Sequence, residues 1–421
     1  MQYGCIGEKL GHSFSKEIHA ALADYTYELC EMPYDALEGF FEKKEFLGIN
    51  VTIPYKEAVI PFLDEIDEAA NRIGAVNTVV NRGGRLCGYN TDFYGMSDMI
   101  SRVGVSLKGK KIAVLGSGGT SRTACAVAAS LGAATVLRVG RTERQGCIDY
   151  ERLYSEHRDL QYIINTTPCG MYPYPEGRDG MRAAAVDVAR FPRLEGVIDA
   201  VYNPLRSQLV LEAQKRGIPA LGGLSMLVAQ AVRAAELFLD TAFPKATVDR
   251  VLRKMTAQKE NIVLIGMPAC GKSSVGAALA EMLGRSFVDL DRCIEERAGK
   301  SIPELFSTVG EQGFRDLEER VVADVASTNG LVIATGGGAI LRERNVDNLR
   351  RNGRLYFLDR PLKDLMPTDD RPLSATKEAM EKRYRERYPI YTAVADCRIP
   401  VTGSIDEVRD AVERDFYREK R

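Results

Sequence analysis

The chain has 421 residues, which is too long for one ordinary domain and long enough for two or three separate cores. Its 57 Lys and Arg residues are balanced by 58 Asp and Glu residues, and the formal net charge of -1 offers no basic field to nucleic acid or anionic lipid. We therefore expect small-molecule partners, with neither nucleic acid nor a membrane among them. No apolar run of about 18 residues and no leader-like N-terminus occurs, which predicts a cytoplasmic protein. The 9 Cys residues include no C-x-x-C pair, so we expect free thiols.

The first 256 residues alternate between helical spacing and short β-branched runs. Helical spacing occurs over residues 36–41, 57–66, 123–131, 209–216 and 225–238. Strands are expected over residues 48–53, 111–115, 134–139, 162–165 and 196–199. This alternation predicts α/β architecture with parallel sheets.

A glycine-rich loop follows the predicted strand at residues 111–115, within the string KIAVLGSGGTSRTA. Three glycines lead into an Ala-rich helical stretch: Gly116, Gly118 and Gly119. This order of strand, glycines and helix is typical of a dinucleotide-binding loop. The third position of the glycine pattern is Ser121, and the spacing alone also fits an ordinary strand-to-helix turn.

The strand after this loop ends in Gly140, Arg141 and Thr142. NAD-binding units normally carry an acid near this point, which holds the ribose 2′-hydroxyl. A guanidinium suits the additional 2′-phosphate of NADP, because it is a forked and permanently charged donor. The predicted cofactor is therefore NADP(H), bound by the glycine loop and by Arg141 and Thr142.

A second glycine-rich loop of different chemical type occurs in NIVLIGMPACGKSS. An apolar run over residues 262–265 precedes the loop residues Gly266, Gly271, Lys272, Ser273 and Ser274. This spacing predicts a P-loop for ATP, in which Lys272 reaches the β and γ phosphates and Ser273 gives its hydroxyl to Mg²⁺. Cys270 lies inside the loop, either as a small residue that fits the turn or as a thiolate that makes phosphoryl transfer oxidant-sensitive.

Two carboxylates end the next apolar run, FVDLD. If the strand continues through them, Asp289 and Asp291 point to the same side of the sheet. One carboxylate would then face the metal and its waters, and the other would face an acceptor hydroxyl.

Seven strings follow one another in the first 256 residues: GEKLGHSFSKEIH, NVTIPYK, GAVNTV, GYNTDFYG, INTTPCGM, VYNP and GGLSMLVAQA. With the glycine loop they resemble shikimate dehydrogenase along nearly the whole region. The resemblance implies reduction of 3-dehydroshikimate, with Lys56 and Asp92 as the catalytic pair. A Lys ammonium can stabilise the growing alkoxide and give up a proton, while an Asp carboxylate orients it. Outside this motif, Lys56 would be interpreted as a solvated loop lysine.

The same resemblance implies residues that bind the substrate. Ser13 and Ser15 would bind its carboxylate, although both also suit the N-cap of a helix over residues 16–22. The ring hydroxyls would be bound by three amides, with assistance from a threonine: Asn77, Asn90, Gln230 and Thr52. Arg144, in a shifted register, would be a second basic residue for the cofactor.

The strings GEQGFR, ATGGGAI, DRPL and RYPIY follow the P-loop and FVDLD. Together they resemble shikimate kinase. The resemblance implies that Asp291 binds the shikimate hydroxyls and positions or deprotonates the 3-hydroxyl, and that Asp289 binds Mg²⁺ through water. It also implies that Arg315 and Arg387 clamp the shikimate carboxylate, since bidentate donors match a planar anion.

Two further features of the kinase resemblance concern loops. A run of three glycines would let the backbone approach the shikimate ring closely: Gly336, Gly337 and Gly338. Arg371 would lie in a lid that closes over ATP and stabilises charge on the transferring phosphoryl group. The lid string LKDLMPTDDRPLS holds only this one Arg.

These observations predict an α/β chain of two units. Residues 1–256 would form a two-lobed dehydrogenase, with a substrate lobe over 1–105 plus about 225–256 and a Rossmann-like NADP lobe over 106–224. Residues 257–421 would form a P-loop kinase unit with a nucleoside-monophosphate-kinase-like α/β fold. Gln230 follows the cofactor region, so the chain is expected to return to the substrate lobe, with the active site between the lobes.

Shikimate is the product of the first implied reaction and the acceptor of the second. The predicted function is therefore a bifunctional enzyme that uses NADPH, then ATP and Mg²⁺, on 3-dehydroshikimate and shikimate. Two alternatives stay open: a quinate/shikimate dehydrogenase fused to a kinase of other specificity, and a non-catalytic sensor of shikimate. A pure sensor has no need of four reactive side chains: Lys56, Asp92, Lys272 and Asp291.

Overall fold

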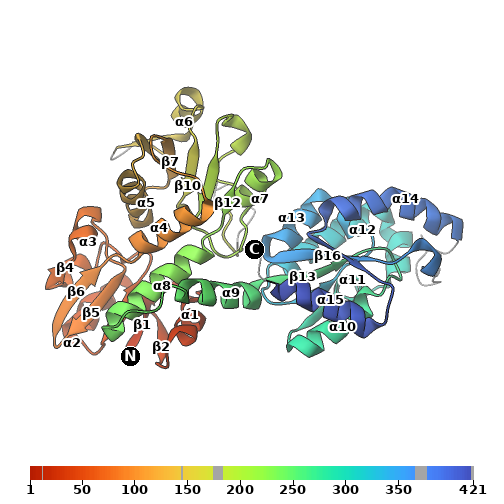
Figure 1. Cartoon of the computed structure of the whole chain (residues 1–421), viewed down its shortest axis with the longest axis horizontal. Helices are drawn as coiled ribbons and strands as arrows, with labels where there is room; N and C mark the ends of the chain where they lie inside the picture. Colours follow the sequence, from red (N-terminus) through yellow and green to blue (C-terminus); the bar gives the residue numbers. More distant parts are fainter. Residues whose placement is uncertain (12, 144–145, 174–183, 366–376, 419–421) are drawn as a thin grey trace. The chain divides into compact units, whose positions relative to one another are not determined.

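The computed structural model describes residues 1–11, 13–143, 146–173, 184–365 and 377–418. The chain divides into two compact units, Met1–Met255 and Thr256–Arg421 (Figure 1). Three sheets form the framework, two in the first unit and one in the second.

The first lobe of the first unit contains a six-stranded sheet with the order β2-β1-β3-β5-β6-β4. Its strands are β1 (Tyr3–Gly7), β2 (Tyr27–Glu31), β3 (Gly48–Val51), β4 (Glu65–Ile66), β5 (Thr78–Arg82) and β6 (Arg85–Tyr89). β5 runs antiparallel to both β3 and β6. Gly83 and Gly84 join β5 to β6 with φ angles of 63° and 95°, as a two-residue hairpin turn requires. This sheet is therefore mixed, and the expectation of parallel strands is wrong for it.

Three helices and two 3-10 turns accompany this sheet: α1 (Ser15–Leu22), α2 (Leu37–Lys43), α3 (Glu68–Ile73), η1 (Tyr34–Ala36) and η2 (Ile60–Phe62). The helix predicted over residues 57–66 is wrong, because this segment holds only η2 and the short strand β4. Pro61 explains the difference. It has no N–H to donate to the carbonyl four residues earlier, so an α-helix cannot continue through it.

The second lobe contains a six-stranded sheet in which every pair of neighbours is parallel, with the order β12-β11-β10-β7-β8-β9. Its strands are β7 (Lys111–Leu115), β8 (Thr135–Val139), β9 (Cys147–Ile148), β10 (Tyr162–Asn165), β11 (Gly196–Asp199) and β12 (Ala220–Leu221). Counted from β7, this is the 3-2-1-4-5-6 order of a dinucleotide-binding fold. Ile112, Val114 and Leu115 are fully buried, as a strand covered on both faces should be.

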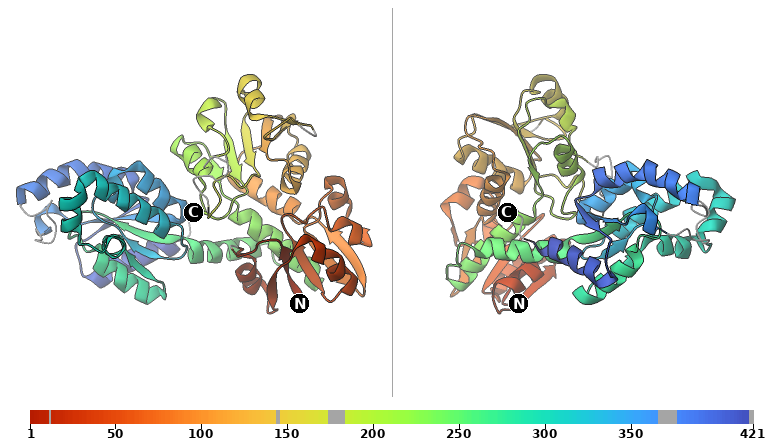
Figure 2. Two further views of the ribbon diagram at one scale, coloured as in Figure 1. Left: turned by 180° about the vertical axis from the view of Figure 1, so that it is seen from behind. Right: turned by 45° about the vertical axis from the view of Figure 1, so that its right-hand side comes forward.

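Helix α4 (Asp92–Val103) follows the last strand of the first lobe, and the helices of the second lobe are α5 (Gly119–Ser130), α6 (Tyr150–Glu156), α7 (Gln208–Lys215) and the 3-10 turn η3 (Val188–Arg190). After β12 the chain enters α8 (Leu224–Leu239), which packs on α4, α1 and β5. Figures 1 and 2 show α8, in green, beside the red and orange elements of the first lobe. A Cβ on Gly48 would lie 2.2 Å from Phe238 Cδ1, so the missing side chain lets α8 approach β3.

The second unit contains a five-stranded parallel sheet with the order β14-β15-β13-β16-β17. Its strands are β13 (Asn261–Ile265), β14 (Phe287–Asp289), β15 (Val332–Ala334), β16 (Gly353–Asp359) and β17 (Cys397–Pro400). Its helices are α10 (Lys272–Leu283), α11 (Leu290–Ala298), α12 (Ile302–Ala326), α13 (Glu343–Asn352), α14 (Lys377–Val394) and α15 (Ile405–Tyr417). The 3-10 turns are η4 (Ala339–Leu341) and η5 (Leu362–Asp364).

Two features of the second unit position its site. α12 is kinked at Gly310, whose φ of 70° and ψ of 178° only glycine adopts readily. The central strand β13 leads directly into the glycine loop and α10. The remaining helix, α9 (Thr247–Lys259), spans the division between the two units.

Candidate active sites

The two residues expected to carry the reduction lie together in the first unit. Lys56 follows β3, Asp92 begins α4, and Lys56 Nζ donates a hydrogen bond to Asp92 Oδ2 at 2.5 Å. Their side chains are only 14% and 8% exposed. Because so little solvent reaches the pair, the carboxylate holds the ammonium in one position with little screening.

The glycine loop after β7 lies against Lys56. A Cβ on Gly119 would lie 3.7 Å from Lys56 Cβ and Cδ. Gly116 has a φ of 121°, and a Cβ there would lie 2.5 Å from Thr166 Oγ1, so both the conformation and the space require glycine. Gly118 is the N-cap of α5, so the loop presents the N–H groups of a helix terminus, a ready anion site, beside Lys56.

Ser121 takes the third place of the glycine pattern without opening the loop. It is buried, and its hydroxyl donates to the Gly116 carbonyl at 2.7 Å. The departure from Gly or Ala is therefore compensated by a hydrogen bond that closes the loop.

Arg141 and Thr142 are exposed after the end of β8. The acid beside them, Glu143, pairs with Arg152 at 3.4 Å. The Arg141 guanidinium is therefore the exposed charge that an anionic 2′-phosphate would meet at this strand end. Arg144 lies outside the described residues.

The three predicted amides are buried at the ends of β5, β6 and within α8, with exposures of 3% for Asn77, 9% for Asn90 and 7% for Gln230. Asn77 Nδ2 lies 3.5 Å from Gln230 Oε1, although the two residues are 153 positions apart. Asn90 Nδ2 donates to the Ala75 carbonyl at 2.9 Å and to Thr123 Oγ1 of α5 at 3.3 Å. Asn90 therefore ties the first lobe to the cofactor helix.

Ser13 and Ser15 lie at the start of α1, where the Ser15 N–H donates to Ser13 Oγ at 3.3 Å. The N-cap residue is Phe14, which makes no side-chain cap hydrogen bond, so the two serines are not the caps of this helix. Tyr202 lies beside them. Burial raises the pKa of Tyr202 to about 12, and a hydrogen bond with Ser13 acts in the opposite direction. Thr52 follows β3, and its N–H donates to the Ile6 carbonyl at 3.0 Å.

The P-loop of the second unit is closed by its own lysine. Lys272 Nζ donates to the carbonyls of Gly266 and Met267 at 3.0 and 2.9 Å. Gly266 and Gly271 have φ angles of 148° and 101°, so the loop turns through left-handed conformations that suit glycine. Cys270 is fully buried in this turn, so the structure favours its role as a small residue over that of an oxidant-sensitive thiolate.

Ser273 and Asp289 form a pair suited to a metal ion. Ser273 Oγ donates to Asp289 Oδ2 at 2.6 Å, and both oxygens are hard ligands of the kind that Mg²⁺ prefers. Ser274 is exposed on the same turn of α10. The described part of the chain contains no group of three or more His, Cys, Asp or Glu side chains placed to share a metal ion. The residues therefore fit an ion that takes its other ligands from phosphate oxygens and water.

The geometry expected for FVDLD is corrected by the structure. β14 ends at Asp289, which is the N-cap of α11, and Asp289 Oδ1 accepts the N–H of Asp291 at 3.1 Å. Asp291 therefore lies in the first turn of a helix rather than on the strand. The reason is that an Asp after a strand readily caps a helix, which competes with strand continuation.

The shikimate-binding candidates meet at the glycine run after β15. A Cβ on Gly336 would lie 2.4 Å from Asp291 Oδ1, and a Cβ on Gly338 would lie 2.4 Å from Nη1 and Nη2 of Arg315. Arg387 Nη1 donates to the Gly337 carbonyl at 2.9 Å. The carboxylate and both guanidiniums thus surround one loop that has no side chains of its own. Arg371 lies outside the described residues.

Two residues at this loop were not predicted. Glu318 is 2% exposed and accepts a hydrogen bond from Arg315 Nη1 at 2.7 Å. Burial raises the pKa of Glu318, while the neighbouring Arg315 lowers it. Tyr391 is fully buried and donates to the Gly337 carbonyl at 2.6 Å. Glu318 follows Arg315 by three positions on a helix, a spacing that could have suggested the pair.

In the first unit, the sequence reasoning missed Tyr202 and Thr91. Tyr202 belongs to the VYNP string, so its motif was noticed but its phenol was not assigned. Thr91 lies between Asn90 and Asp92, and its hydroxyl lies 3.0 Å from Asn77 Nδ2. Its position between two predicted site residues was the feature of the sequence that could have indicated it.

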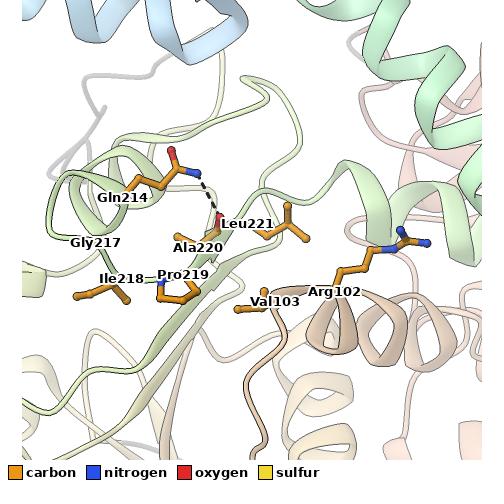
Figure 3. Close-up of a pocket in the computed structure, with 8 residues that line it drawn as sticks. All are labelled: Arg102, Val103, Gln214, Gly217, Ile218, Pro219, Ala220 and Leu221. Carbon is orange, nitrogen blue, oxygen red and sulfur yellow. Dashed lines mark hydrogen bonds between the residues drawn. The ribbon is translucent and has the colours of Figure 1, made fainter. Parts of the chain in front are cut away.

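A shallow hollow of about 420 Å³ lies elsewhere on the first unit, between the end of α4 and the α7–β12 connection (Figure 3). None of the candidate site residues lines it. Gln214 Nε2 donates to the Ala220 carbonyl at 3.2 Å, and Arg102 pairs with Asp98 and Asp249. Its polar side chains are therefore already engaged within the protein, and the hollow belongs to neither site.

Comparisons with known proteins divide the chain in the same way. A family model described as the shikimate dehydrogenase substrate binding domain matches residues 5–79, and one described as shikimate kinase matches residues 268–415. The shikimate dehydrogenase (NADP(+)) of Clostridium perfringens is 35% identical over 271 residues, which cover 60% of this chain and 97% of that protein. The enzyme of the same name from Halothermothrix orenii is 36% identical over 263 residues, which cover 56% of this chain and 89% of that protein.

Solved structures give the same result for the fold. The crystal structure of shikimate dehydrogenase 1 from Peptoclostridium difficile matches with a TM-score of 0.55 at 31% identity, covering 61% of this chain and 98% of that chain. A chorismate mutase/shikimate 5-dehydrogenase fusion protein from Clostridium acetobutylicum matches with a TM-score of 0.55 at 34% identity, covering 60% and 96%. Within the described ranges, no helix is long and apolar enough to cross a membrane. The predicted α/β fold class is confirmed, and the chain belongs to the shikimate dehydrogenase family and carries a shikimate kinase domain in its second unit.

Proposed function

We propose that the chain reduces 3-dehydroshikimate to shikimate with NADPH in its first unit and phosphorylates the 3-hydroxyl of shikimate with MgATP in its second. The observation that carries this proposal is the contact between the glycine loop and Lys56, which is hydrogen-bonded to Asp92 at 2.5 Å. Lys56 Cβ and Cδ lie 3.7 Å from the position of a Gly119 Cβ. A proton donor is thereby held at the place where a dinucleotide loop would hold a hydride donor.

We assign residues 1–256 to the reductase and residues 257–421 to the kinase. Within the reductase, residues 1–105 and about 225–256 form the substrate lobe, and residues 106–224 form the NADP lobe. The packing of α8 against α1 and β5 supports this assignment, because it returns Gln230 to the first lobe.

In the reductase, bound NADPH supplies the hydride. Lys56 holds its ammonium at the keto oxygen, stabilises the negative charge that develops there and gives the oxygen a proton. Asp92 keeps the ammonium in place through its hydrogen bond. Ser13 and Ser15 bind the carboxylate. Asn77, Asn90 and Gln230 bind the ring hydroxyls, with Thr52 beside them.

In the kinase, bound Mg²⁺ neutralises phosphate charge, and Ser273 and Asp289 are the residues that hold it. Lys272 exchanges its two carbonyl partners for phosphate oxygens when the nucleotide enters. Asp291 positions the 3-hydroxyl and accepts its proton. Arg315 and Arg387 bind the shikimate carboxylate, and the glycine loop beside them leaves room for the ring.

A coupled assay on the purified chain tests this proposal. NADPH loss and ADP release are followed separately after addition of 3-dehydroshikimate, NADPH and MgATP. We expect both signals, with ADP release dependent on the first substrate or on added shikimate. Quinate and NAD⁺ in the reverse reaction test the alternative specificity, and a faster rate with either of them would overturn the assignment of the first unit. NADPH loss without ADP release, even with added shikimate, would overturn the assignment of the second.

A further inference from the structure

A buried network of hydrogen-bonded side chains lies behind the amides of the reductase site. We call it the amide network, and its members are Tyr27, Asn50, Thr78, Asn77, Thr91 and Gln230. All six residues are buried, from 0% exposed for Thr78 to 7% for Asn50 and Gln230. A buried polar atom without a partner in the protein cannot form a hydrogen bond to bulk water instead, which costs free energy. Each donor in the amide network must therefore face an acceptor.

Backbone groups fix which atom of each amide is oxygen and which is nitrogen. The Thr91 N–H can only donate, and it lies 2.7 Å from Asn77 Oδ1. The Leu227 carbonyl can only accept, and Gln230 Nε2 donates to it at 3.0 Å. Asn50 Nδ2 is fixed in the same way by the Asn77 carbonyl at 3.4 Å. The three amides therefore have defined orientations.

The hydroxyl directions follow from these orientations. Asn50 Oδ1 faces Tyr27, so the Tyr27 hydroxyl must donate to it, at 2.7 Å. Thr78 Oγ1 accepts from Asn50 Nδ2 at 3.1 Å, so its own hydrogen is donated onward, either to Asn77 Oδ1 at 3.2 Å or to Thr91 Oγ1 at 3.1 Å, which in turn lies 3.3 Å from Asn77 Oδ1. A chain of donors thus runs from Tyr27 through Asn50 and Thr78 to Asn77.

The donor at the start of this chain keeps its proton. Burial raises the pKa of Tyr27 well above its usual range. The His19 ring stacks on Tyr27 at a centroid distance of 3.8 Å, and burial lowers the pKa of His19 to about 3, so the neighbouring ring is neutral. Tyr27 therefore keeps the proton that it donates to Asn50.

The result is an Asn77 amide with one free side. Asn77 Oδ1 accepts from the Thr91 N–H and faces the hydroxyls of Thr78 and Thr91 at 3.2 and 3.3 Å. Asn77 Nδ2 donates to Thr91 Oγ1 at 3.0 Å, and its second hydrogen has only the long 3.5 Å contact with Gln230 Oε1. A substrate hydroxyl oxygen is a better acceptor for this hydrogen at ordinary hydrogen-bond distance.

We propose that Tyr27 and Thr78 are positioning residues, which hold the Asn77 amide with its nitrogen toward a ring hydroxyl of the substrate through the amide network. This inference rests on the proposed reductase function. Without the Thr78 hydroxyl, Asn77 Oδ1 loses a donor, either directly or through Thr91. Without the Tyr27 hydroxyl, Asn50 Oδ1 loses its donor, and the amide that orients Thr78 is held only by the long 3.4 Å hydrogen bond to the Asn77 carbonyl. In both cases fewer hydrogen bonds restrain the amides, and the site presents its donor less often.

The test compares four variants of the full chain: Tyr27→Phe, Thr78→Val, Thr78→Ser and the control Tyr25→Phe. The Tyr25 hydroxyl bonds to His19 Nδ1 and is not part of the amide network. Steady-state oxidation of shikimate by NADP⁺ gives kcat and KM. Two shikimate analogues, each lacking one of the hydroxyls that is not oxidised, give the substrate preference. Thermal unfolding reports whether each variant is folded.

We expect Tyr27→Phe and Thr78→Val to raise the KM for shikimate about threefold to tenfold, the effect of one lost hydrogen bond, with little change in kcat. The preference for shikimate over one of the analogues should fall by a similar factor, because the lost donor distinguishes them. Thr78→Ser should keep the parent values. The pH dependence of kcat should not move, since Lys56 and Asp92 lie outside the amide network.

An unchanged KM and preference in folded Tyr27→Phe and Thr78→Val would overturn this inference alone, provided that the parent chain oxidises shikimate. An equal effect of Tyr25→Phe would also overturn it, because any buried phenol would then matter. A parent chain without turnover would overturn the proposed reductase function and this inference together. If Thr78→Val does not fold, Tyr27→Phe decides, since it keeps the ring that stacks on His19.

Discussion

Lys56 and Asp92 lie 36 positions apart in the chain and meet at 2.5 Å. Because β5 is antiparallel to both β3 and β6, the latter two strands run in the same direction and end at the same edge of the sheet. Lys56 follows β3 and Asp92 follows β6, so the sheet itself brings the ammonium to the carboxylate. The positive charge of Lys56 and the negative charge of Asp92 thus form an ion pair that is largely shielded from solvent.

Replacing Lys56 by Ala should remove the proton donor of the reduction. We expect kcat for NADPH oxidation to fall by about 10²- to 10⁴-fold, the usual contribution of general acid catalysis. ADP release with added shikimate should be unchanged, because the kinase residues lie in the other unit. Lys44→Ala is the control, since Lys44 forms a partly exposed pair with Asp64. A reductase rate that falls no further than in this control would contradict the assigned role.

Asp289 accepts hydrogen bonds from the Ser273 hydroxyl and from the N–H of Asp291 in the first turn of α11. Asp289→Asn keeps the shape but removes a charge next to the proposed metal position. The Mg²⁺ concentration for half-maximal ADP release should rise about tenfold to a hundredfold. A Mg²⁺ titration at fixed ATP and shikimate measures this shift. Asp324→Asn, which breaks an exposed pair with Arg297, should leave the midpoint in place, and an equal midpoint in both variants would remove Asp289 from the metal site.

At the scale of elements, buried acceptors fix the loops that follow the strands. Asp199, the last residue of β11, is fully buried and accepts hydrogen bonds from Asn165 Nδ2, the Val201 N–H and Ser207 Oγ. Ser207 is also the N-cap of α7. One carboxylate therefore joins two strand ends and a helix start, around the segment that carries Tyr202.

Burial raises the pKa of Asp199 to about 6, although its three hydrogen bonds act to lower it. A carboxyl whose pKa is higher in the folded state gives its full contribution to stability below the unfolded value near 4, and loses it as the pH rises through about 6. The loss amounts to about 3 kcal/mol between these limits. Asp199→Asn cannot ionise, and its amide can still accept from Asn165 and Val201 and donate to Ser207.

We therefore expect Asp199→Asn to become more stable relative to the parent as the pH rises from about 4 to about 7. Urea unfolding of both proteins across this range, followed through the transition that abolishes NADPH oxidation, gives the difference in free energy of unfolding. A difference that stays constant with pH would show that the pKa of this carboxyl is the same in the folded and unfolded chain, and would contradict the raised pKa.

At the scale of the whole molecule, the two candidate sites draw their residues from separate units. α9 belongs to both, since Val251 and Met255 pack with α1 and α8 in the first unit, whereas Ala257 packs against the core of the second. The Ala257 and Glu260 carbonyls also accept hydrogen bonds from Arg285. Each unit thus needs part of this helix to complete its packing.

Two overlapping fragments, residues 1–260 and 243–421, should each keep one activity because each retains α9 and a complete site. We expect kcat and KM of each fragment to stay within about twofold of the intact chain, as for independent sites. NADPH oxidation and ADP release, measured on each fragment and on an equimolar mixture, provide the check. A folded fragment that is inactive alone and active in the mixture would show that its site needs the other unit.

Much of this organisation could be predicted from local features of the sequence. The strands predicted at residues 111–115, 162–165 and 196–199 are β7, β10 and β11 without any change of bounds. Their continuous apolar runs, and the glycines that follow the first of them, are features of a few consecutive residues, so the local sequence is enough to predict them. The helix predicted over residues 57–66 is wrong because the prediction followed the spacing of the apolar residues. Pro61, in the middle of that segment, prevents an α-helix from continuing.

The sequence by itself determined the two glycine loops, their families and the side chains able to carry the chemistry, because motifs record local backbone requirements. Only the tertiary structure decided that Asp291 lies on a helix, that Glu318 accepts a hydrogen bond from Arg315 and that Tyr27 is connected to Asn77. These facts depend on hydrogen bonds between residues as much as 153 positions apart, as in the contact of Asn77 with Gln230. Such contacts form when sheets and helices pack, and no short segment of the chain specifies them.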